Sequence, residues 1–303
     1  MRYFSKTWQL VILLFCSFAY SGCAVAPDQP QSSSDQPQTS AKMETTKTGK
    51  MVIPFTSLDK SQTYQLHGTL YLPENKQTPS PAVVVVHGTT GIDERGTFYR
   101  KAILDQGIAF FEVDFKTGIF TGALNRPKNT SFVPMAFAAL KELRKLPAID
   151  PTRIGIMGFS LGGGVTVRTA FESYHKKWMG DEKGFIAHAA TYPVCKPFLE
   201  HSEIGSDGLT GAPMIIFYGT EDSYGEGKAV PQFKKLLEEK YNFKVETVEY
   251  AGAAHGFNRN APSFSYKDPA AINEQGYVAW NENAANDSRI KLVDFLKKNL
   301  ISQ

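Results

Sequence analysis

Residues 153–164 read Arg153-Ile154-Gly155-Ile156-Met157-Gly158-Phe159-Ser160-Leu161-Gly162-Gly163-Gly164. An apolar, strand-like run leads into the pattern Gly-x-Ser-x-Gly, and helix-compatible residues follow it. A serine on such a strand-to-helix turn has a strained backbone, so its near neighbours must lack side chains. Gly158 and Gly162 meet that need, and the N-terminus of the following helix favours negative charge beside Ser160. The segment therefore predicts an exposed nucleophilic serine; the alternative is a glycine-rich turn with an incidental serine.

A histidine suited to activate this serine occurs late in the chain. A serine hydroxyl is a weak nucleophile at neutral pH and needs a base to accept its proton. Among the 6 histidines, His255 fits the chain order of nucleophile, then acid, then histidine, and small residues flank it. His87 ends an expected strand and belongs to another motif, whereas His188 lies within a strand. We expect His255 to act as the base; a loop histidine without a role is the alternative.

The acid that orients this histidine should follow a late strand. Residues 214–219 form an apolar, strand-like run, and Glu221 and Asp222 stand just after it. Asp222 completes a Gly-x-x-Asp motif with Gly219, which is the usual spacing in folds that carry a nucleophilic serine on a strand-to-helix turn. Glu221 is the competitor one residue earlier. We expect Asp222 to hold the tautomer of His255 and to stabilise the imidazolium that forms when the serine attacks.

Two backbone N–H groups should face the negative oxygen of a tetrahedral intermediate. One belongs to Leu161, the residue after the serine. The other should come from the loop after the first long parallel strand, residues 87–91, with Thr89 as the donor. A simple glycine-rich turn is the alternative for this loop, but its position after a strand agrees with the serine motif.

Strand-like and helix-like runs alternate along residues 51–303. Residues 51–57 and 65–72 alternate as two strands. Further strand-like runs occupy residues 82–87, 108–115, 153–159, 185–192, 214–219 and 244–250. Helices are expected over residues 94–106, 134–146, 161–175, 229–241 and 284–299. A continuous apolar run such as residues 82–86 is typical of a central parallel strand covered on both faces. The order predicts one α/β domain, built on a doubly wound, mostly parallel sheet flanked by helices.

Together these motifs resemble the α/β-hydrolase fold and, more narrowly, the dienelactone hydrolase family. The resemblance begins near residue 60 and includes residues 150–155, the Gly-x-x-Asp motif, residues 254–257 and the closing helix over residues 284–296. There are two departures. The type enzyme of the family has a cysteine nucleophile where this chain has Ser160, and a glutamate where it has Gly88. The resemblance therefore implies a serine esterase on the same scaffold, rather than a hydrolase of dienelactone itself.

The connections between the expected strands bear on the pocket. The segment between residues 192 and 214 is shorter than a full lid domain usually needs, so we expect an open pocket without a large lid. Residues 116–133 and 258–283 are the other variable stretches and should line it. Cys195 follows a strand near the expected pocket mouth, and we interpret it as structural or pocket-lining rather than nucleophilic.

The N-terminus has the features of an export signal. Arg2 and Lys6 precede an apolar run over residues 10–20, which is shorter than the about 20 residues of a membrane-spanning helix. Ser21-Gly22-Cys23 resembles the end of a bacterial lipobox, in which the signal is cleaved before the cysteine and the thiol is acylated. We expect a signal peptide over residues 1–22 and a lipid on Cys23; an ordinary cleaved signal is the alternative.

Residues 23–50 should form a disordered tether, because glutamine, serine, threonine, proline and lysine dominate this stretch and leave little to bury. The hydrolase domain would follow at residues 51–303. These features predict an exported bacterial protein that is lipid-anchored on the cell envelope, at the periplasmic face or in the outer membrane. Its expected partners are a membrane, through the N-terminal lipid, and a small-molecule ester. The sequence leaves the oligomeric state open.

The composition excludes several classes of protein. Charged residues make up 21% of the chain and hydrophobic residues 42%, as in an ordinary globular protein. A net charge of +3, which falls by two when Arg2 and Lys6 leave with the signal, is too small for a nucleic-acid footprint. The chain shows no dinucleotide-binding or P-loop motif and no paired histidines or cysteines at ligand spacing. We therefore expect no cofactor and no metal.

The residues thus predict a serine hydrolase that cleaves small or moderate-sized carboxylic esters through an acyl-enzyme. A peptidase, amidase or acyltransferase built on the same three residues is an alternative, because these residues do not specify the leaving group. A tethered binding protein with an inactive site is a further alternative from a different class.

Overall fold

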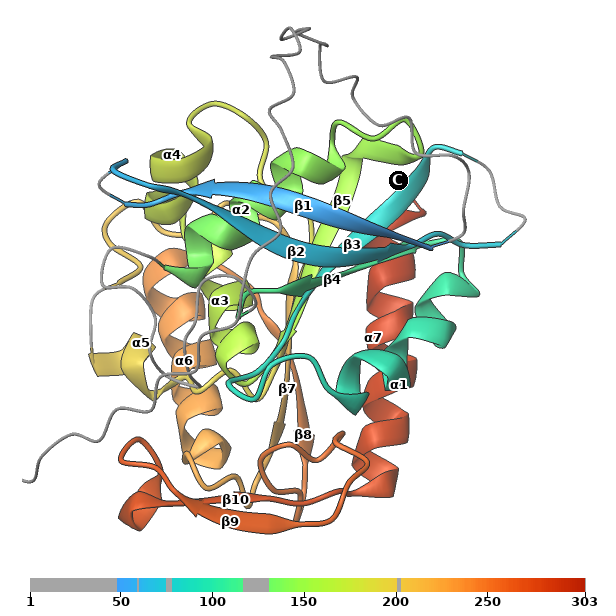
Figure 1. Cartoon of the computed structure of the whole chain (residues 1–303). Helices are drawn as coiled ribbons and strands as arrows, with labels where there is room; N and C mark the ends of the chain where they lie inside the picture. The colour runs from blue at the N-terminus through green and yellow to red at the C-terminus, as the bar shows by residue number, and fades with distance from the viewer. Residues whose placement is uncertain (1–47, 59, 75–77, 117–130, 201–202, 303) are drawn as a thin grey trace, which may run out of the picture. The chain divides into compact units, whose positions relative to one another are not determined.

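The computed structural model describes residues 48–58, 60–74, 78–116, 131–200 and 203–302 (Figure 1). The expected signal peptide, the expected lipidation site Cys23 and the expected tether lie outside these residues, except that residues 48–50 begin the first strand. Within the described part of the chain, no helix is long and apolar enough to cross a membrane. An eight-stranded sheet determines where the other elements lie.

This sheet has the strand order β1-β2-β4-β3-β5-β6-β7-β8. Its strands are β1 (Thr48–Thr56), β2 (Thr63–Tyr71), β3 (Ser80–Val86), β4 (Ala109–Asp114), β5 (Ile149–Phe159), β6 (His188–Thr191), β7 (Met214–Gly219) and β8 (Glu246–Tyr250). β1 pairs antiparallel with β2, and β2 pairs antiparallel with β4. All neighbouring pairs from β4 to β8 are parallel, which confirms the mostly parallel sheet that the sequence predicts.

Helices cover both faces of the sheet (Figure 1). One face carries α1 (Glu94–Leu104) and α7 (Glu282–Leu300). The other carries α2 (Phe132–Leu143), α3 (Leu161–Thr169), α4 (Glu172–Met179), α5 (Lys196–Glu200) and α6 (Glu226–Tyr241). In β3, Val83 and Val85 pack with residues of α1 and α7, whereas Val84 and Val86 pack with residues of α2. Successive strand residues face opposite sides, so the valine run is buried on both faces.

The expected helix over residues 161–175 is broken into α3 and α4. Phe171, between the two helices, has an extended backbone and forms a bridge with Leu209. The N–H of Thr210 donates to the carbonyl of Ala170 at 2.9 Å. A segment about forty residues away in sequence thus takes backbone hydrogen bonds that a continuous helix would have used.

A second sheet of two strands does not follow from the sequence pattern. β9 (Phe264–Lys267) and β10 (Gln275–Val278) pair antiparallel, with a short 3-10 helix, Ile272–Glu274, between them. Most of their side chains are exposed, so neither strand has the apolar run that marks the strands of the main sheet. A parallel bridge between His255 and Val278 joins this hairpin to the loop that follows β8.

Phe217→Ala should destabilise the fold strongly. Phe217 lies in β7, is 0% exposed and belongs to the cluster formed with α1 and α7. Loss of a buried aromatic ring costs about 3–5 kcal/mol of unfolding free energy. Urea unfolding followed by circular dichroism measures this loss. Ile290→Ala on α7, where the side chain is 60% exposed, is the control and should stay within about 0.5 kcal/mol of the wild type. Similar losses in both variants would contradict the assigned core.

Candidate active site

The three expected side chains meet at the carboxyl edge of the parallel sheet. Ser160 lies between β5 and α3, Asp222 follows β7, and His255 follows β8. Loops at this edge form the ligand crevice in open α/β sheets. His255 Nε2 lies 2.8 Å from Ser160 Oγ, and His255 Nδ1 lies 2.8 Å from Asp222 Oδ2. Three residues from distant parts of the chain therefore form one chain of hydrogen bonds.

These hydrogen bonds determine where the ring proton of His255 lies. The carboxylate of Asp222 accepts hydrogen bonds, so the Nδ1–H of His255 donates to it. The other nitrogen, Nε2, is then the acceptor for the hydroxyl of Ser160. Asp222 Oδ1 also accepts the N–H of Tyr224 at 2.8 Å, which holds the carboxylate in place. The arrangement leaves His255 able to take a proton from the serine.

The competing acid, Glu221, has an exposed side chain, whereas Asp222 is only 4% exposed. The N–H of Glu221 donates to the carbonyl of Ala253 at 3.0 Å, so its backbone is tied to the loop before the histidine. Of the two acids, it is Asp222 that the structure brings to His255.

Ser160 has the strained backbone that the sequence predicts, with φ 53° and ψ −115°. Residues other than glycine rarely adopt a positive φ. A Cβ on Gly162 would overlap the carbonyl oxygen of Val86 in β3, and a Cβ on Gly158 would overlap the carbonyl oxygen of Gly162. The two glycines of the motif are therefore required by the close approach of α3 to the sheet.

Two tyrosine rings pack against the imidazole of His255, a feature that no sequence spacing marks. The ring centroids of Tyr192 and Tyr224 each lie 4.6 Å from that of His255. The Tyr192 hydroxyl donates to Asn258 Oδ1, and the Tyr224 hydroxyl donates to Asp268 Oδ2 at 2.7 Å. Burial raises the pKa of both phenols, so both stay neutral. The two rings restrict the rotation of the imidazole.

The loop after β3, residues 87–91, is held by His87. The ring of His87 accepts the N–H of Phe115 at Nε2 (3.1 Å) and donates from Nδ1 to the carbonyl of Gly88 (2.7 Å). Burial lowers the pKa of His87, so the ring stays neutral and can make both bonds. Thr89 lines the same cavity as the serine. Leu161 is the first residue of α3, so its N–H has no acceptor within the helix.

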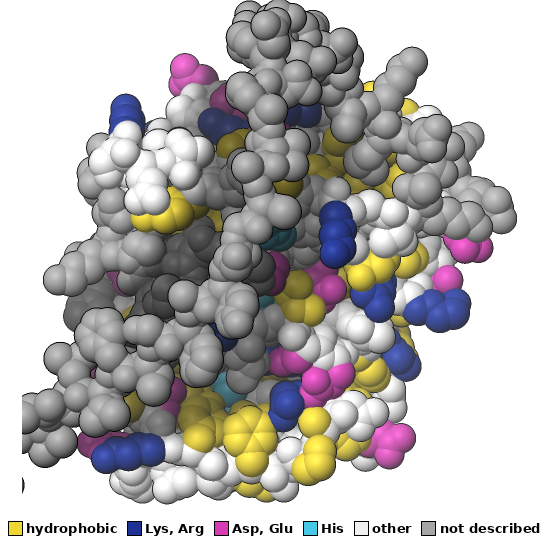
Figure 2. Space-filling model, viewed as in Figure 1, with side chains coloured by type: hydrophobic (Ala, Val, Ile, Leu, Met, Phe, Trp, Pro, Cys, Tyr) yellow, Lys and Arg dark blue, Asp and Glu magenta, His cyan; other side chains and the backbone are white. Residues whose placement is uncertain are grey.

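A cavity of about 320 Å³ contains Ser160 and His255 in its lining. The β9–β10 hairpin and the segments around it supply much of the wall, including Phe264, Tyr266 and Val278. Figure 2 shows hydrophobic side chains gathered over this hairpin, at the bottom of the view. The expectation that the stretch 258–283 lines the pocket is confirmed. For the other expected stretch, residues 117–130 lie outside the described residues.

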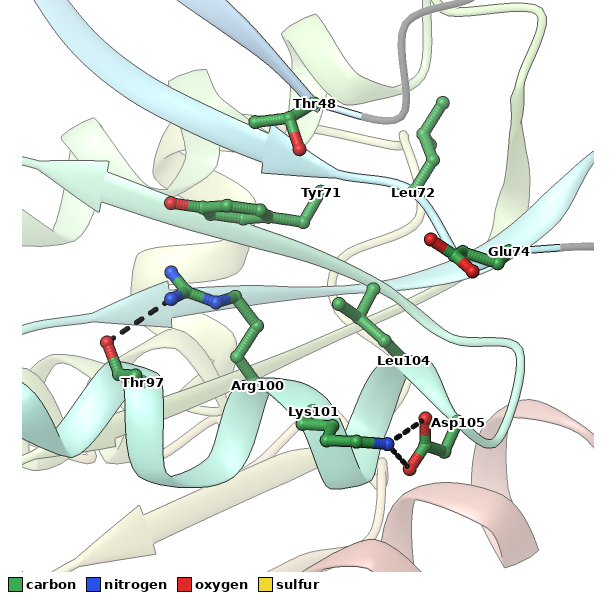
Figure 3. A pocket seen from close by; sticks show the side chains of 9 residues that line it. All are labelled: Thr48, Tyr71, Leu72, Glu74, Thr97, Arg100, Lys101, Leu104 and Asp105. Atoms are coloured by element: carbon green, nitrogen blue, oxygen red, sulfur yellow. Dashed lines mark hydrogen bonds and ion pairs between the residues drawn. The ribbon is translucent and has the colours of Figure 1, made fainter.

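A larger cavity, of about 660 Å³, lies beside α1 and shares no lining residue with the first (Figure 3). Its charged side chains have partners within the chain: Arg100 donates to Thr97, and Lys101 binds Asp105 at 2.7 Å. The described residues that line it include no serine, cysteine or histidine. Among the residues that the structure describes, no three histidines, cysteines or acids group as a metal site requires. The chemistry of the lining residues therefore favours the smaller cavity as the functional site.

Cys195 is fully buried, which agrees with the structural role expected for it. Its N–H donates to Glu226 Oε1 at 2.7 Å. Burial, with the charge of Glu226 as a second cause, raises the pKa of the Cys195 thiol, which disfavours the thiolate that a nucleophile needs. Burial also raises the pKa of Glu226 to about 8, and the charge of Asp222 adds to this effect. A neutral carboxylic acid, which the sequence pattern does not reveal, thus lies near the site.

The fold and the site together define the α/β-hydrolase class. A serine follows a central parallel strand on a glycine turn, an acid follows a later strand, and a histidine follows the last strand of the main sheet. The family model of the dienelactone hydrolase family matches residues 66–300. The chain therefore belongs to the dienelactone hydrolase family.

Individual proteins are also similar to this chain. Esterase FrsA of Photorhabdus laumondii is 29% identical over 105 residues, which are 34% of this chain and 25% of that protein, so the match spans a quarter of the relative's length. A dienelactone hydrolase-like promiscuous phosphotriesterase from metagenomic libraries superposes with a TM-score of 0.58 at 15% identity, over 84% of this chain and 99% of its own. Thermogutta terrifontis esterase 2, phosphorylated by paraoxon, superposes with a TM-score of 0.55 at 20% identity, over 82% of this chain and 94% of its own. The two superpositions show the shared fold.

Glu226→Gln should remove a pH dependence of stability. The folded-state pKa of Glu226, about 8, lies above the ordinary value of 4.5, so the folded protein keeps a proton that the unfolded chain releases between these pH values. The wild-type free energy of unfolding should therefore fall as the pH rises through this range, by several kcal/mol at about 1.4 kcal/mol per pKa unit. Glutamine keeps an acceptor for the N–H of Cys195 but cannot ionise.

Urea unfolding from about pH 5 to about pH 9 measures this effect, since it covers most of the window in which only the unfolded chain ionises. The profile of Glu226→Gln should be flatter than that of the wild type, and the difference should widen up to the folded-state pKa of Glu226 and stay at its maximum above it. Glu221→Gln, which alters an exposed carboxylate, is the control and should leave the profile unchanged. Parallel profiles for Glu226→Gln and the wild type would contradict the assignment.

Proposed function

We propose that this protein is a serine hydrolase that cleaves carboxylic esters. One observation carries the proposal: Ser160 Oγ is hydrogen-bonded to His255, which is hydrogen-bonded to the buried Asp222. Membership of the dienelactone hydrolase family supports hydrolysis as the reaction. In this proposal Ser160 is the nucleophile, His255 is the general base and acid, and Asp222 orients the imidazole.

The first half of the reaction forms an acyl-enzyme. His255 Nε2 takes the hydroxyl proton as Ser160 Oγ attacks the carbonyl carbon of the ester. The N–H groups of Leu161 and Thr89 bind the negative oxygen of the tetrahedral intermediate. The bond from the acyl carbon to the alcohol oxygen then breaks, and His255 gives its proton to the leaving alcohol.

Water completes the reaction. His255 takes a proton from a water molecule as the water oxygen attacks the acyl carbon. The bond to Ser160 Oγ breaks, the serine regains a proton from His255, and the carboxylic acid leaves. Throughout, Asp222 stabilises the imidazolium, and the rings of Tyr192 and Tyr224 that pack against the imidazole hold it in place.

Esters are favoured as substrates by the relatives, two of which bear the name esterase. A cavity of about 320 Å³ suits molecules of small or moderate size. The three residues do not themselves select the leaving group, so peptidase, amidase and acyltransferase activities are the alternatives. A tethered protein that binds a ligand without reacting is the alternative from another class.

The proposed place of action is the bacterial cell envelope, at the periplasmic face or in the outer membrane. The basic residues and short apolar run before Cys23 support export, and the Ser-Gly-Cys sequence supports a lipid on this cysteine. The proposed partners are therefore a small-molecule ester and, through the lipid, a membrane.

Ser160→Ala should abolish both labelling and hydrolysis. A fluorophosphonate probe should label the wild type at Ser160, and the variant should not react. Removal of the nucleophile should lower kcat for a short-chain aryl ester by about 10⁴-fold or more. Ser173→Ala in α4 is the matched control and should keep both activities. A folded wild type that the probe does not label would sink the hydrolase proposal, and faster cleavage of an amide than of an aryl ester would favour the alternatives.

The two neighbouring acids provide a second control for the same prediction. Asp222→Asn should lower kcat by about 10⁴-fold, because the asparagine favours the wrong tautomer of His255. Glu221→Gln, one residue away and exposed, should keep the wild-type rate. The reverse result would assign the orienting role to Glu221.

Cys23→Ser should release the protein from membranes. Acylation of the thiol supplies the proposed anchor, and serine offers no thiol to acylate. Fractionation of cells that express the full chain, with metabolic labelling by radioactive palmitate, measures both effects. The wild type should be labelled and sediment with membranes, whereas the variant should be unlabelled. A Cys23→Ser protein that stays on membranes would refute the lipid anchor.

A further inference from the structure

A buried guanidinium lies beside the loop that carries Thr89. Arg95, in the first turn of α1, is 5% exposed and lines the same cavity as Ser160. It takes no part in the hydrogen bonds that join Ser160, His255 and Asp222. A buried charge needs hydrogen-bond partners, and those of Arg95 show which segments it holds together.

Arg95 ties the loop after β3 to the start of α1. Its Nε and Nη2 donate to Asp93 Oδ1 and Oδ2 at 2.7 and 2.5 Å. Nη2 also donates to Thr90 Oγ1 at 3.0 Å, and the Thr90 hydroxyl donates to Asp93 at 3.1 Å. Asp93 in turn caps α1 by accepting the N–H of Arg95. The planar guanidinium therefore binds Thr90, the residue after Thr89, to a rigid helix.

The same guanidinium fills the space beside Gly88. A Cβ on Gly88 would lie 2.9 Å from Arg95 Nη2 and 3.0 Å from Nη1. The guanidinium therefore occupies the space that a side chain at position 88 would need. Arg95 thus packs against the backbone immediately before Thr89 and bonds the side chain immediately after it.

Arg95 also contacts the other half of the site. Its guanidinium carbon lies 5.6 Å from the ring centroid of Phe159, the residue before Ser160. The hydroxyl of Tyr192, whose ring packs against His255, interacts with the guanidinium as well. One side chain therefore touches the loop of Thr89, the serine turn and the neighbour of the histidine.

We propose that Arg95 is a positioning residue that holds residues 88–90 so that the N–H of Thr89 faces the oxyanion. This inference rests on the serine hydrolase function proposed above. The N–H of Thr89 binds an oxygen that is negative only near the transition state, so loss of Arg95 should lower kcat and leave KM nearly unchanged. A side chain needed only for stability would lower the fraction of folded protein instead.

Arg95→Met, which keeps an unbranched stem but removes the guanidinium and its charge, is the direct test. Hydrolysis of an aryl ester is measured and normalised to the sites that a fluorophosphonate titrates. The kcat should fall by about 10²-fold, the effect of a misplaced oxyanion donor, with KM within about threefold of the wild type. Arg100→Met is the matched control on the same helix, since Arg100 lies over Tyr71 in the other cavity, and it should leave kcat unchanged (Figure 3).

Two further variants test the contacts themselves. Gly88→Ala forces a Cβ against the guanidinium and should lower kcat by about tenfold, but should cost little more when Arg95→Ala has removed the collision. Guanidinium ion added to Arg95→Ala should restore part of the lost kcat, which a purely structural role would not predict. If the kcat losses of Gly88→Ala and Arg95→Ala multiplied in the double variant, and guanidinium ion restored no activity, the proposal would be overturned.

The outcomes separate this inference from the proposed function. A wild type that is labelled at Ser160 and hydrolyses esters, with an Arg95→Met variant of unchanged kcat, overturns the inference and leaves the function intact. An Arg95→Met variant in which only KM rises overturns it as well, because this result would assign Arg95 to substrate binding. If Arg95 variants fail to fold, Gly88→Ala and Thr90→Val carry the test, and unchanged kcat in both overturns the inference.

Discussion

The close approach of α3 to β3 is the constraint on which the site depends. Gly162 has no Cβ, so the first turn of α3 lies against the carbonyl of Val86, and Ser160 is forced into a positive-φ conformation. Backbone hydrogen bonds hold it there: the N–H of Ser160 donates to Thr191 at 3.0 Å, and the carbonyl of Ser160 accepts the N–H of Gly164 at 2.9 Å. Because the backbone alone fixes the serine, its hydroxyl is available to His255.

His255 is held by its neighbours rather than by its own loop. Through Tyr192 it is connected to Asn258, which donates to the hydroxyl of Tyr99 in α1 at 2.8 Å. Through Tyr224 it is connected to the β9–β10 hairpin, where that hydroxyl meets Tyr266 and Asp268. Buried polar groups are costly to leave unpaired, so both networks oppose displacement of the imidazole. The hairpin is therefore both a wall of the cavity and a support for the histidine.

Most of the fold could be predicted because its signals are local. Each of the eight expected runs is a strand of the main sheet. The inner parallel strands are apolar because both of their faces are covered, whereas β1 and β2 alternate exposed and buried side chains. The glycine pattern around Ser160 is equally local. By contrast, the hairpin has mostly exposed side chains, and the break between α3 and α4 depends on pairing of Phe171 with Leu209. A pattern read along the chain does not contain contacts between distant segments.

The sequence by itself determined where the strands lie along the chain, the serine turn and the loop that carries the histidine. Glycines and apolar runs set the backbone conformation and burial of the residues next to them, so these features can be predicted from a short stretch of sequence. Only the tertiary structure decided that Asp222 rather than Glu221 meets His255, and that Arg95 and Glu226 are buried. A charged residue in the first turn of a helix has the same local pattern whether water or a packed loop covers it. Its burial, and with it its charge and partners, depends on which distant segments fold against it.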